Sequence, residues 1–129
     1  MTNVYSNPLG LNVPANYHHS VETPANCQFL YVAGQTGVDP AGNVPDGIEA
    51  QAKIVFERIK IVLEASNYGL EHVVFMKSFL VNREDRAGYQ KIRETFWGDI
   101  KPASTFLIVS GLADPDYLLE VECIAAKPA

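Results

Sequence analysis

The sequence predicts an α+β fold in which a mixed β-sheet is covered on one face by two helices. The expected elements follow the order β-β-α-β-α-β-β, and a further short strand can be placed near the N-terminus. Each predicted helix connects two strands, which makes some strand pairs parallel. Turn sequences near both ends of the chain predict hairpins, which make other pairs antiparallel.

Length and composition indicate one globular domain spanning residues 1–129. The chain has 129 residues, 47% of them hydrophobic, and a net charge of −5 from 15 acidic and 10 basic residues. This balance disfavours nucleic-acid binding, because affinity for phosphates depends on lysine and arginine. We expect no membrane span, because no apolar run approaches about 18 residues. The N-terminal residues lack a signal-peptide pattern, so a cytoplasmic location is expected.

The first half of the chain predicts a short strand and an irregular loop within residues 1–16, then a hairpin of strands 17–22 and 28–35. A helix is expected to begin at Asp46, because Asp46 and Glu49 together resemble a capping box. Apolar residues recur along it at helical spacing, and Asn67 or Gly69 is expected to end it.

The second half predicts a central strand over residues 73–81, covered on both faces, because the segment is almost entirely apolar. Asn82 is expected to cap a helix over residues 83–97 that stops at Gly98. Residues 105–109 and 117–124 are predicted to form a second hairpin.

The last predicted strand carries two carboxylates within an apolar run. Alternate residues of a strand share a face, so Glu120 and Glu122 point one way while Leu119, Val121 and Cys123 point towards the core. With two helices on one side, the other sheet face has no cover in this chain. It is expected either to drive self-association or to be a solvated antiparallel face.

Three runs of sequence resemble the Rid family, which is also called YjgF-like and includes proteins named endoribonuclease L-PSP. They are AGQTGVDPAGN, EAQAKIVFERIKIVLEASNYGLEHVV and KPASTFLIVSGL with YLLEVECIAA, and the resemblance spans residues 17–126. It implies a chorismate-mutase-like fold and a homotrimer with three ligand clefts between subunits. It also implies hydrolysis of enamines and imines, such as 2-aminoacrylate, to keto acids and ammonia. Neither a cofactor nor a metal is expected.

One departure from the family pattern concerns the residue that binds the substrate carboxylate. The family's Pro-Ala-Arg-Ser corresponds here to Pro102-Ala103-Ser104-Thr105, so Ser104 stands where the arginine is expected. A hydroxyl cannot replace the two-pronged guanidinium. Either the substrate lacks that carboxylate, or another cation, Lys101 or Arg93, binds it.

Further positions are assigned roles by the same resemblance. Glu120 matches the glutamate that places or activates the attacking water, although a sheet glutamate paired for structural reasons is the alternative. Ala33 and Gly34 match the Ser-Gly of the family's Ser-Gly-Gln. Thr105 and Phe106 follow Ser104 in the expected cleft. With Ala, Ser and Phe at three of these positions, the cleft is expected to be less cationic and more apolar than in the deaminases.

The segment Tyr17-His18-His19-Ser20-Val21 resembles the family's Tyr-Ser-x-Ala-Val and leaves open whether Tyr17, His19 or Ser20 lines the cleft. Gln90 matches a helix asparagine near the family's cleft. The sequence thus predicts a small-molecule hydrolase of the deaminase kind with altered substrate choice. The alternatives are a non-catalytic metabolite-binding or regulatory trimer and, disfavoured by the net charge, an endoribonuclease or translation inhibitor.

Overall fold

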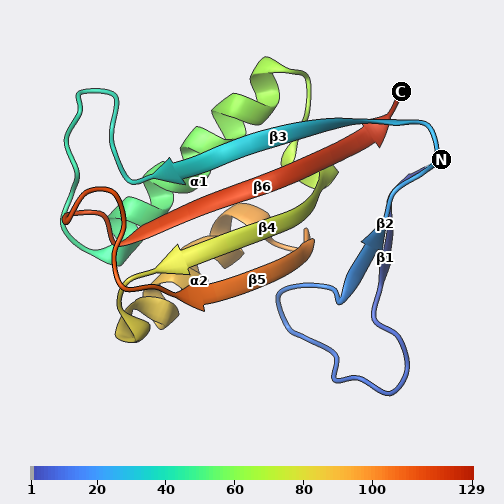
Figure 1. Ribbon diagram of the computed structural model, residues 1–129, viewed down its shortest axis with the longest axis horizontal. Coiled ribbons are helices and arrows are strands. Elements are labelled where there is room, and N and C mark those ends of the chain that lie inside the picture. The colour runs from blue at the N-terminus through green and yellow to red at the C-terminus, as the bar shows by residue number, and fades with distance from the viewer. Residues whose placement is uncertain (1) are drawn as a thin grey trace.

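The computed structural model describes residues 2–129 and contains a four-stranded sheet, a small two-stranded sheet and two helices (Figure 1). Short 3-10 turns, η1 (Leu70–His72) and η2 (Arg83–Asp85), precede β4 and α2. The strands and helices are β1 (Val4–Ser6), β2 (Ser20–Glu22), β3 (Cys27–Thr36), α1 (Ile48–Ala65), β4 (Val73–Leu80), α2 (Arg86–Trp97), β5 (Ala103–Ile108) and β6 (Leu119–Pro128).

The order of strands in the main sheet is β3-β6-β4-β5, which shows that both predicted hairpins were wrong. β2 pairs with β1 and not with β3. β6 does not fold back on β5 but inserts between β3 and β4, antiparallel to both, while β5 runs parallel to β4 at the edge. The turn sequences are real, but they join strands that pair elsewhere. The mixed sheet itself was correctly predicted.

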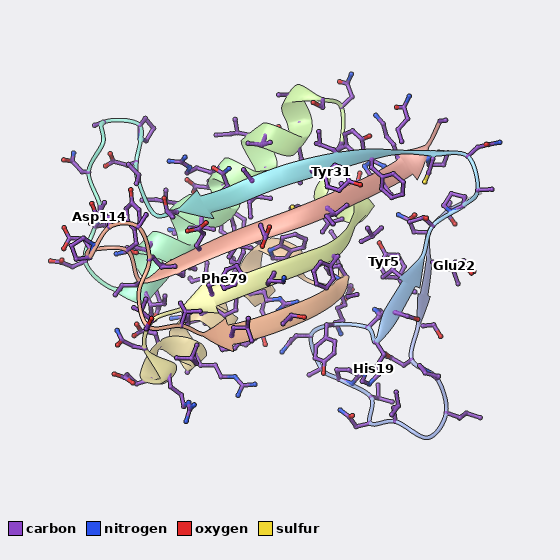
Figure 2. The ribbon with its side chains drawn as sticks, in the orientation of Figure 1. Tyr5, His19, Glu22, Tyr31, Phe79 and Asp114 are labelled. Atoms are coloured by element: carbon purple, nitrogen blue, oxygen red, sulfur yellow. The ribbon has the colours of Figure 1, made fainter. Side chains whose placement is uncertain are left out.

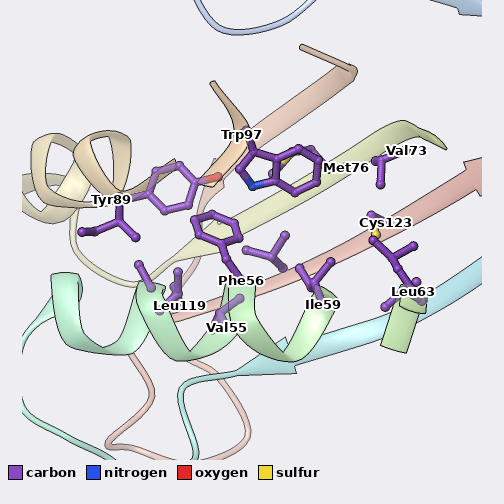
Figure 3. Packing of buried hydrophobic residues seen from close by; sticks show 14 of the residues in the cluster. Val55, Phe56, Ile59, Leu63, Val73, Met76, Tyr89, Trp97, Leu119 and Cys123 are labelled. Carbon is purple, nitrogen blue, oxygen red and sulfur yellow. The ribbon is translucent and has the colours of Figure 1, made fainter. Parts of the chain in front are cut away.

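Both helices cover the same face of the main sheet, as predicted, and lie behind it in Figure 1. Residues of α1 and α2 form one core with the inward-facing residues of β4 and β6 (Figure 3). Phe56 of α1 lies at its centre, with the rings of Tyr89 and Trp97 about it at centroid distances of 6.0 Å each. Leu119, Val121 and Cys123 face this core, as the alternation of the strand predicted.

The C-terminal end of α1 agrees with the prediction, whereas its N-terminal end does not. Gly47 is the N-cap and no side chain caps the helix, so the predicted Asp46–Glu49 capping box is absent. Asn67 ends the helix with φ of 63°. The Asn67 N–H donates to the Glu64 carbonyl and the Tyr68 N–H to the Leu63 carbonyl, which is the Schellman arrangement.

The second helix begins later than predicted. Asn82 precedes the 3-10 turn η2, and α2 itself starts at Arg86, with Asp85 at its N-cap and Gly98 at its C-cap. Tyr89, Ile92 and Trp97 of this helix are buried in the core.

No element within residues 2–129 covers the opposite face of the main sheet. Phe75, Lys77 and Phe79 of β4 are only half-buried there, so the prediction that this strand is covered on both faces was wrong for a single chain. Tyr31 of β3 is 72% exposed on this face, and Figure 2 looks directly onto it, with Tyr31 and Phe79 labelled. Within residues 2–129, neither helix combines the length and the hydropathy that crossing a bilayer requires.

Candidate functional site

A pocket of about 490 Å³ lies between α2, the edge strand β5 and the loop that leads to β2. The loop closes one side because His18 forms a parallel bridge with Ala103 at the start of β5. The His18 N–H donates to the Pro102 carbonyl at 3.3 Å. The lining residues are Asn12, Pro14, Ala15, Asn16, Tyr17, Arg86, Gln90, Arg93, Ser104 and Phe106.

Arg93 is the buried cation of this pocket, with 5% of its surface exposed. Its Nη2 donates to the Asn16 carbonyl at 2.9 Å, and its Nη1 lies 3.5 Å from Ser104 Oγ. Ion pairs within residues 2–129 join His72 to Glu71 and Lys91 to Glu49, and none of them involves Arg93. The guanidinium thus lies beside Ser104, and no carboxylate within residues 2–129 forms an ion pair with it.

Arg86 is the second guanidinium of the pocket and was not anticipated from the sequence. It is exposed, and its Cζ lies 5.5 Å from the centroid of the Phe106 ring, as in a cation–π contact. Phe106 is itself held by Tyr89, with 5.6 Å between the ring centroids. The spacing of Arg86, Gln90 and Arg93, at i, i+4 and i+7, places all three on one face of α2. This spacing is the feature of the sequence from which Arg86 could have been placed beside Arg93.

Gln90 lies between the two arginines on that face. Its Nε2 is buried and has no hydrogen-bond partner among residues 2–129. Buried polar groups are ordinarily paired, so this amide has unused capacity at the wall of the pocket.

Of the three candidates for the cleft, Tyr17, His19 and Ser20, the structure places only one in the pocket. Tyr17 lines the pocket, whereas His19 and Ser20 are not part of its lining. His19 Nε2 lies 2.8 Å from the Asn12 carbonyl and its ring meets that of Tyr17 edge-on at 5.8 Å. His19, labelled in Figure 2, therefore supports the loop and the tyrosine. Ser20 is exposed in β2.

Tyr89 links the core to Arg93. Its hydroxyl is hydrogen-bonded to Ser78 Oγ inside the core. Burial raises the pKa of Tyr89, and the nearby Arg93 charge and hydrogen bonds from Ser78 and Arg93 oppose this rise only in part. The phenol therefore remains neutral beside the Arg93 charge.

Glu120 contacts Gly34, the residue after Ala33, and is not part of the pocket lining. A bulge in β3 places Ala33 and Gly34 between the pairs Val32–Cys123 and Gln35–Val121. A Cβ built on Gly34 would lie 2.0 Å from Glu120 Oε2, so the carboxylate rests on the glycine backbone. Glu120 is half-buried, and no cation within residues 2–129 forms an ion pair with it.

Ser104 and Glu120 lie on opposite faces of the sheet. Ser104 is opposite Met76 of β4, whereas Glu120 is opposite Phe79, and residues three apart in a strand point to opposite faces. Thr105 pairs with Lys77, so it shares the face of Glu120. A single chain therefore does not bring the predicted residues together.

Lys101, the other candidate cation, lies in a separate cavity with Tyr5, His18 and Glu71. It is absent from the lining of the arginine pocket. The pocket carries two guanidinium groups, those of Arg86 and Arg93. The expectation that the cleft is less cationic than in the deaminases stays a prediction. Within residues 2–129, no three histidine, cysteine, aspartate or glutamate side chains gather as metal ligands would.

Comparisons with known proteins agree on one family. The family described as Endoribonuclease L-PSP matches residues 10–127. A RutC family protein of Pyrococcus horikoshii is 38% identical over 101 residues, which is 77% of this chain and 79% of that protein. Protein HMF1 of Saccharomyces cerevisiae is 31% identical over 114 residues, which is 88% of this chain and 85% of that protein.

Solved structures show the same fold. A Rid family protein of unknown function, YyfB from Yersinia pestis, superimposes with a TM-score of 0.86 at 27% identity, covering 98% of this chain and 100% of that one. RidA from an Antarctic Psychrobacter gives a TM-score of 0.72 at 28% identity, covering 88% and 90%. The two helices on a mixed sheet are thus the chorismate-mutase-like fold of these proteins, and the chain belongs to the Endoribonuclease L-PSP family, the Rid or YjgF family.

Proposed function

We propose that the protein is a cytoplasmic homotrimeric hydrolase of carboxylate-bearing enamines or imines, in which Arg93 binds the substrate carboxylate. One observation carries the proposal: Arg93 is 5% exposed, lines the pocket beside Ser104 and has no carboxylate partner within residues 2–129. The guanidinium is thus supplied from α2 rather than from β5, at the position where the family resemblance places an arginine.

The electrostatic argument concerns the cost of a buried charge. An unpaired buried ion costs several kcal/mol, because the interior solvates it less well than water does. The Asn16 carbonyl accepts one N–H, but it carries no charge to balance the guanidinium. A ligand carboxylate would supply that charge and could accept two parallel N–H bonds from the fork.

The chemistry requires a base for water as well as a carboxylate clamp. In imine hydrolysis, a water oxygen forms a bond to the C=N carbon as the base takes its proton, and the π electrons move to nitrogen. The base passes this proton to nitrogen, which gives a carbinolamine. The carbinolamine hydroxyl then loses its proton to nitrogen, its electron pair forms the C=O bond, and the C–N bond breaks to release ammonia and a keto acid. The half-buried Glu120, which has no partner cation among residues 2–129, suits the role of that proton carrier.

Assembly would complete the site. Because Glu120 and Arg93 lie on opposite faces of one sheet, a second copy must bring its Glu120 to the arginine pocket. The exposed apolar side chains of the uncovered face, Tyr31 and Phe29 among them, give a surface that such an association would bury. A closed ring of identical heterologous contacts, here a trimer, satisfies this requirement for every copy.

Turnover of freshly generated 2-aminoacrylate, or of imines with larger side chains, to keto acid and ammonia tests the proposal. We expect Arg93→Gln to lower kcat/KM about 30-fold or more, the effect of losing one partner of a desolvated charge pair. Glu120→Gln should lower kcat by about 10²-fold or more. Arg83→Gln, an exposed arginine outside the pocket, is the matched control. An unchanged rate in both site variants would reject the assignment.

A non-catalytic metabolite-binding trimer is the second candidate, and Ala33 favours it. This residue precedes Gly34, the glycine that contacts Glu120, and carries a methyl group where the family resemblance expects a hydroxyl. Keto-acid binding that depends on Arg93, with no turnover of any imine, would establish this alternative. RNA cleavage, which the family name suggests, remains disfavoured by the net charge of −5.

A further inference from the structure

We propose that the substrate of this pocket is a dicarboxylate, with one carboxylate bound by Arg93 and the second by Arg86. The substrate class is the imine or enamine of an acidic amino acid with four or five carbons, which hydrolyses to a 2-oxo dicarboxylate. This inference rests on the proposed function and specifies its substrate.

The charge of the pocket is the first support. Its lining contains two guanidinium groups and no aspartate or glutamate. Neither arginine takes part in the ion pairs found within residues 2–129. One carboxylate would balance Arg93 and leave a second positive charge in the same cavity, whereas a dianion would balance both.

The contact between the Arg86 guanidinium and the Phe106 ring is the second support for the proposal. An exposed arginine ordinarily samples many rotamers, and holding it costs side-chain entropy. Here Phe106 provides a flat surface for the guanidinium, and Tyr89 in turn packs against Phe106. A guanidinium placed over a ring face forms no conventional hydrogen bond with the ring, so its N–H donors stay free for a ligand. The side chain is thus placed where its donors remain available.

The spacing of the two arginines is the third support. Seven residues of α-helix separate Arg86 from Arg93 by about 10.5 Å along the axis, so the two side chains leave α2 about two turns apart. Gln90 lies between them with a buried Nε2 that has no partner among residues 2–129. Two end clamps and a central amide match a short chain with an anionic group at each end. The volume of about 490 Å³ lies within the usual range for ligand pockets.

The experiment compares two stable keto acids that differ in one group. 2-Oxoglutarate carries a second carboxylate where 2-oxopentanoate carries a methyl group, and both are titrated calorimetrically into the assembled protein at low salt. We expect 2-oxoglutarate to bind about tenfold more tightly, as one charge-assisted clamp would give. Arg86→Gln should abolish this preference by lowering the affinity for 2-oxoglutarate to that for 2-oxopentanoate. Arg83→Gln, an exposed arginine outside the pocket, should retain the full preference.

The outcomes separate this inference from the proposed function. If both keto acids bind equally and both lose affinity in Arg93→Gln, the carboxylate site stands and the dicarboxylate inference is wrong. If Arg83→Gln reduces the preference as much as Arg86→Gln does, the effect is general surface charge and the inference is again wrong. If neither keto acid binds, both proposals fail. Because Arg86 is exposed, its replacement does not endanger folding, and circular dichroism of each variant checks this.

Discussion

Gly34 and Glu120 form a contact that leaves no room for any side chain at position 34. A methyl group at Gly34 would lie 2.0 Å from Glu120 Oε2, so Gly34→Ala must displace the carboxylate. Because Glu120 is half-buried and its side chain can turn outwards, we expect little loss of stability but at least a tenfold loss of activity. Turnover and the urea midpoint are measured together.

The matched control is Gly111→Ala, because a Cβ at Gly111 meets nothing within 4 Å. It should leave both quantities unchanged. Full activity in Gly34→Ala would mean that the position of this carboxylate is irrelevant to function.

The two cysteines should differ sharply in reactivity. Burial raises the pKa of Cys123 to about 12 from 9.0, with the neighbouring Glu122 charge as the second cause. The folded state holds this proton more tightly, so the contribution to stability is complete below pH 9 and is lost as the pH rises towards 12. At pH 8, we expect a thiol reagent to label only the half-buried Cys27 in the native protein.

The labelling is followed with an aromatic disulfide reagent, which releases one coloured thiolate, measured by its absorbance, for each cysteine that reacts. Cys27→Ser should remove the native phase, and urea should restore one equivalent from Cys123. Two fast equivalents in the native protein would contradict the burial of Cys123.

At the scale of elements, Asn67 determines how α1 ends. Its φ of 63° lies in the left-handed region, where a β-carbon costs about 1–2 kcal/mol unless a short polar side chain compensates. We expect Asn67→Ala to lower the free energy of unfolding by about 1 kcal/mol and Asn67→Gly to preserve or raise it. Urea unfolding measures both. The neighbouring exposed Ser66, replaced by alanine, is the control, because its φ of −114° suits any residue.

Periodicity predicted the elements and their faces but not their neighbours. The alternation in β6 placed Leu119, Val121 and Cys123 in the core correctly, because a strand between a helix layer and an open face must alternate. It could not show that β6 inserts between β3 and β4, because pairing depends on contacts far apart in sequence. The short turns suggested hairpins between neighbouring strands in the sequence. In the sheet, however, the C-terminal strand β6 lies between β3 and β4.

The sequence allowed candidate site residues to be named, but not the way in which the fold arranges them in space. Family resemblance marked Ser104 as the place of a missing arginine, and Arg93 could be named only as one of two replacements. Which cation lies beside Ser104 depends on how α2 packs against β5, a tertiary contact that no local pattern encodes. Arg86 was missed because its contact with Phe106 arises from the same packing.

For the whole molecule, the uncovered sheet face should hold the assembly together. Tyr31 is 72% exposed on this face of one chain, so Tyr31→Glu should leave the fold intact and break the oligomer by placing a charge in its interface. Ile61, which is 67% exposed on α1 at the helix side, offers the matched control Ile61→Glu. Sedimentation should show monomers for the first variant and trimers for the second. A wild-type monomer would refute the assembly.

Mixing two inactive variants tests whether each site is shared between subunits. Arg93→Gln retains Glu120, and Glu120→Gln retains Arg93. In a hybrid trimer, a cleft where an Arg93→Gln chain supplies Glu120 and a Glu120→Gln chain supplies Arg93 contains both groups. With random assembly at equal amounts, about a quarter of the clefts are complete, so about a quarter of wild-type activity should return.

Recovery must depend on exchange of subunits and not on mere mixing. Co-refolding the two variants from urea should restore activity, whereas combining the folded proteins briefly should not. If both groups acted within one chain, every chain would lack one of them and no mixture would be active. Because Arg93 and Glu120 lie on opposite faces of the same sheet, recovery on co-refolding is the outcome that this geometry requires of an enzyme.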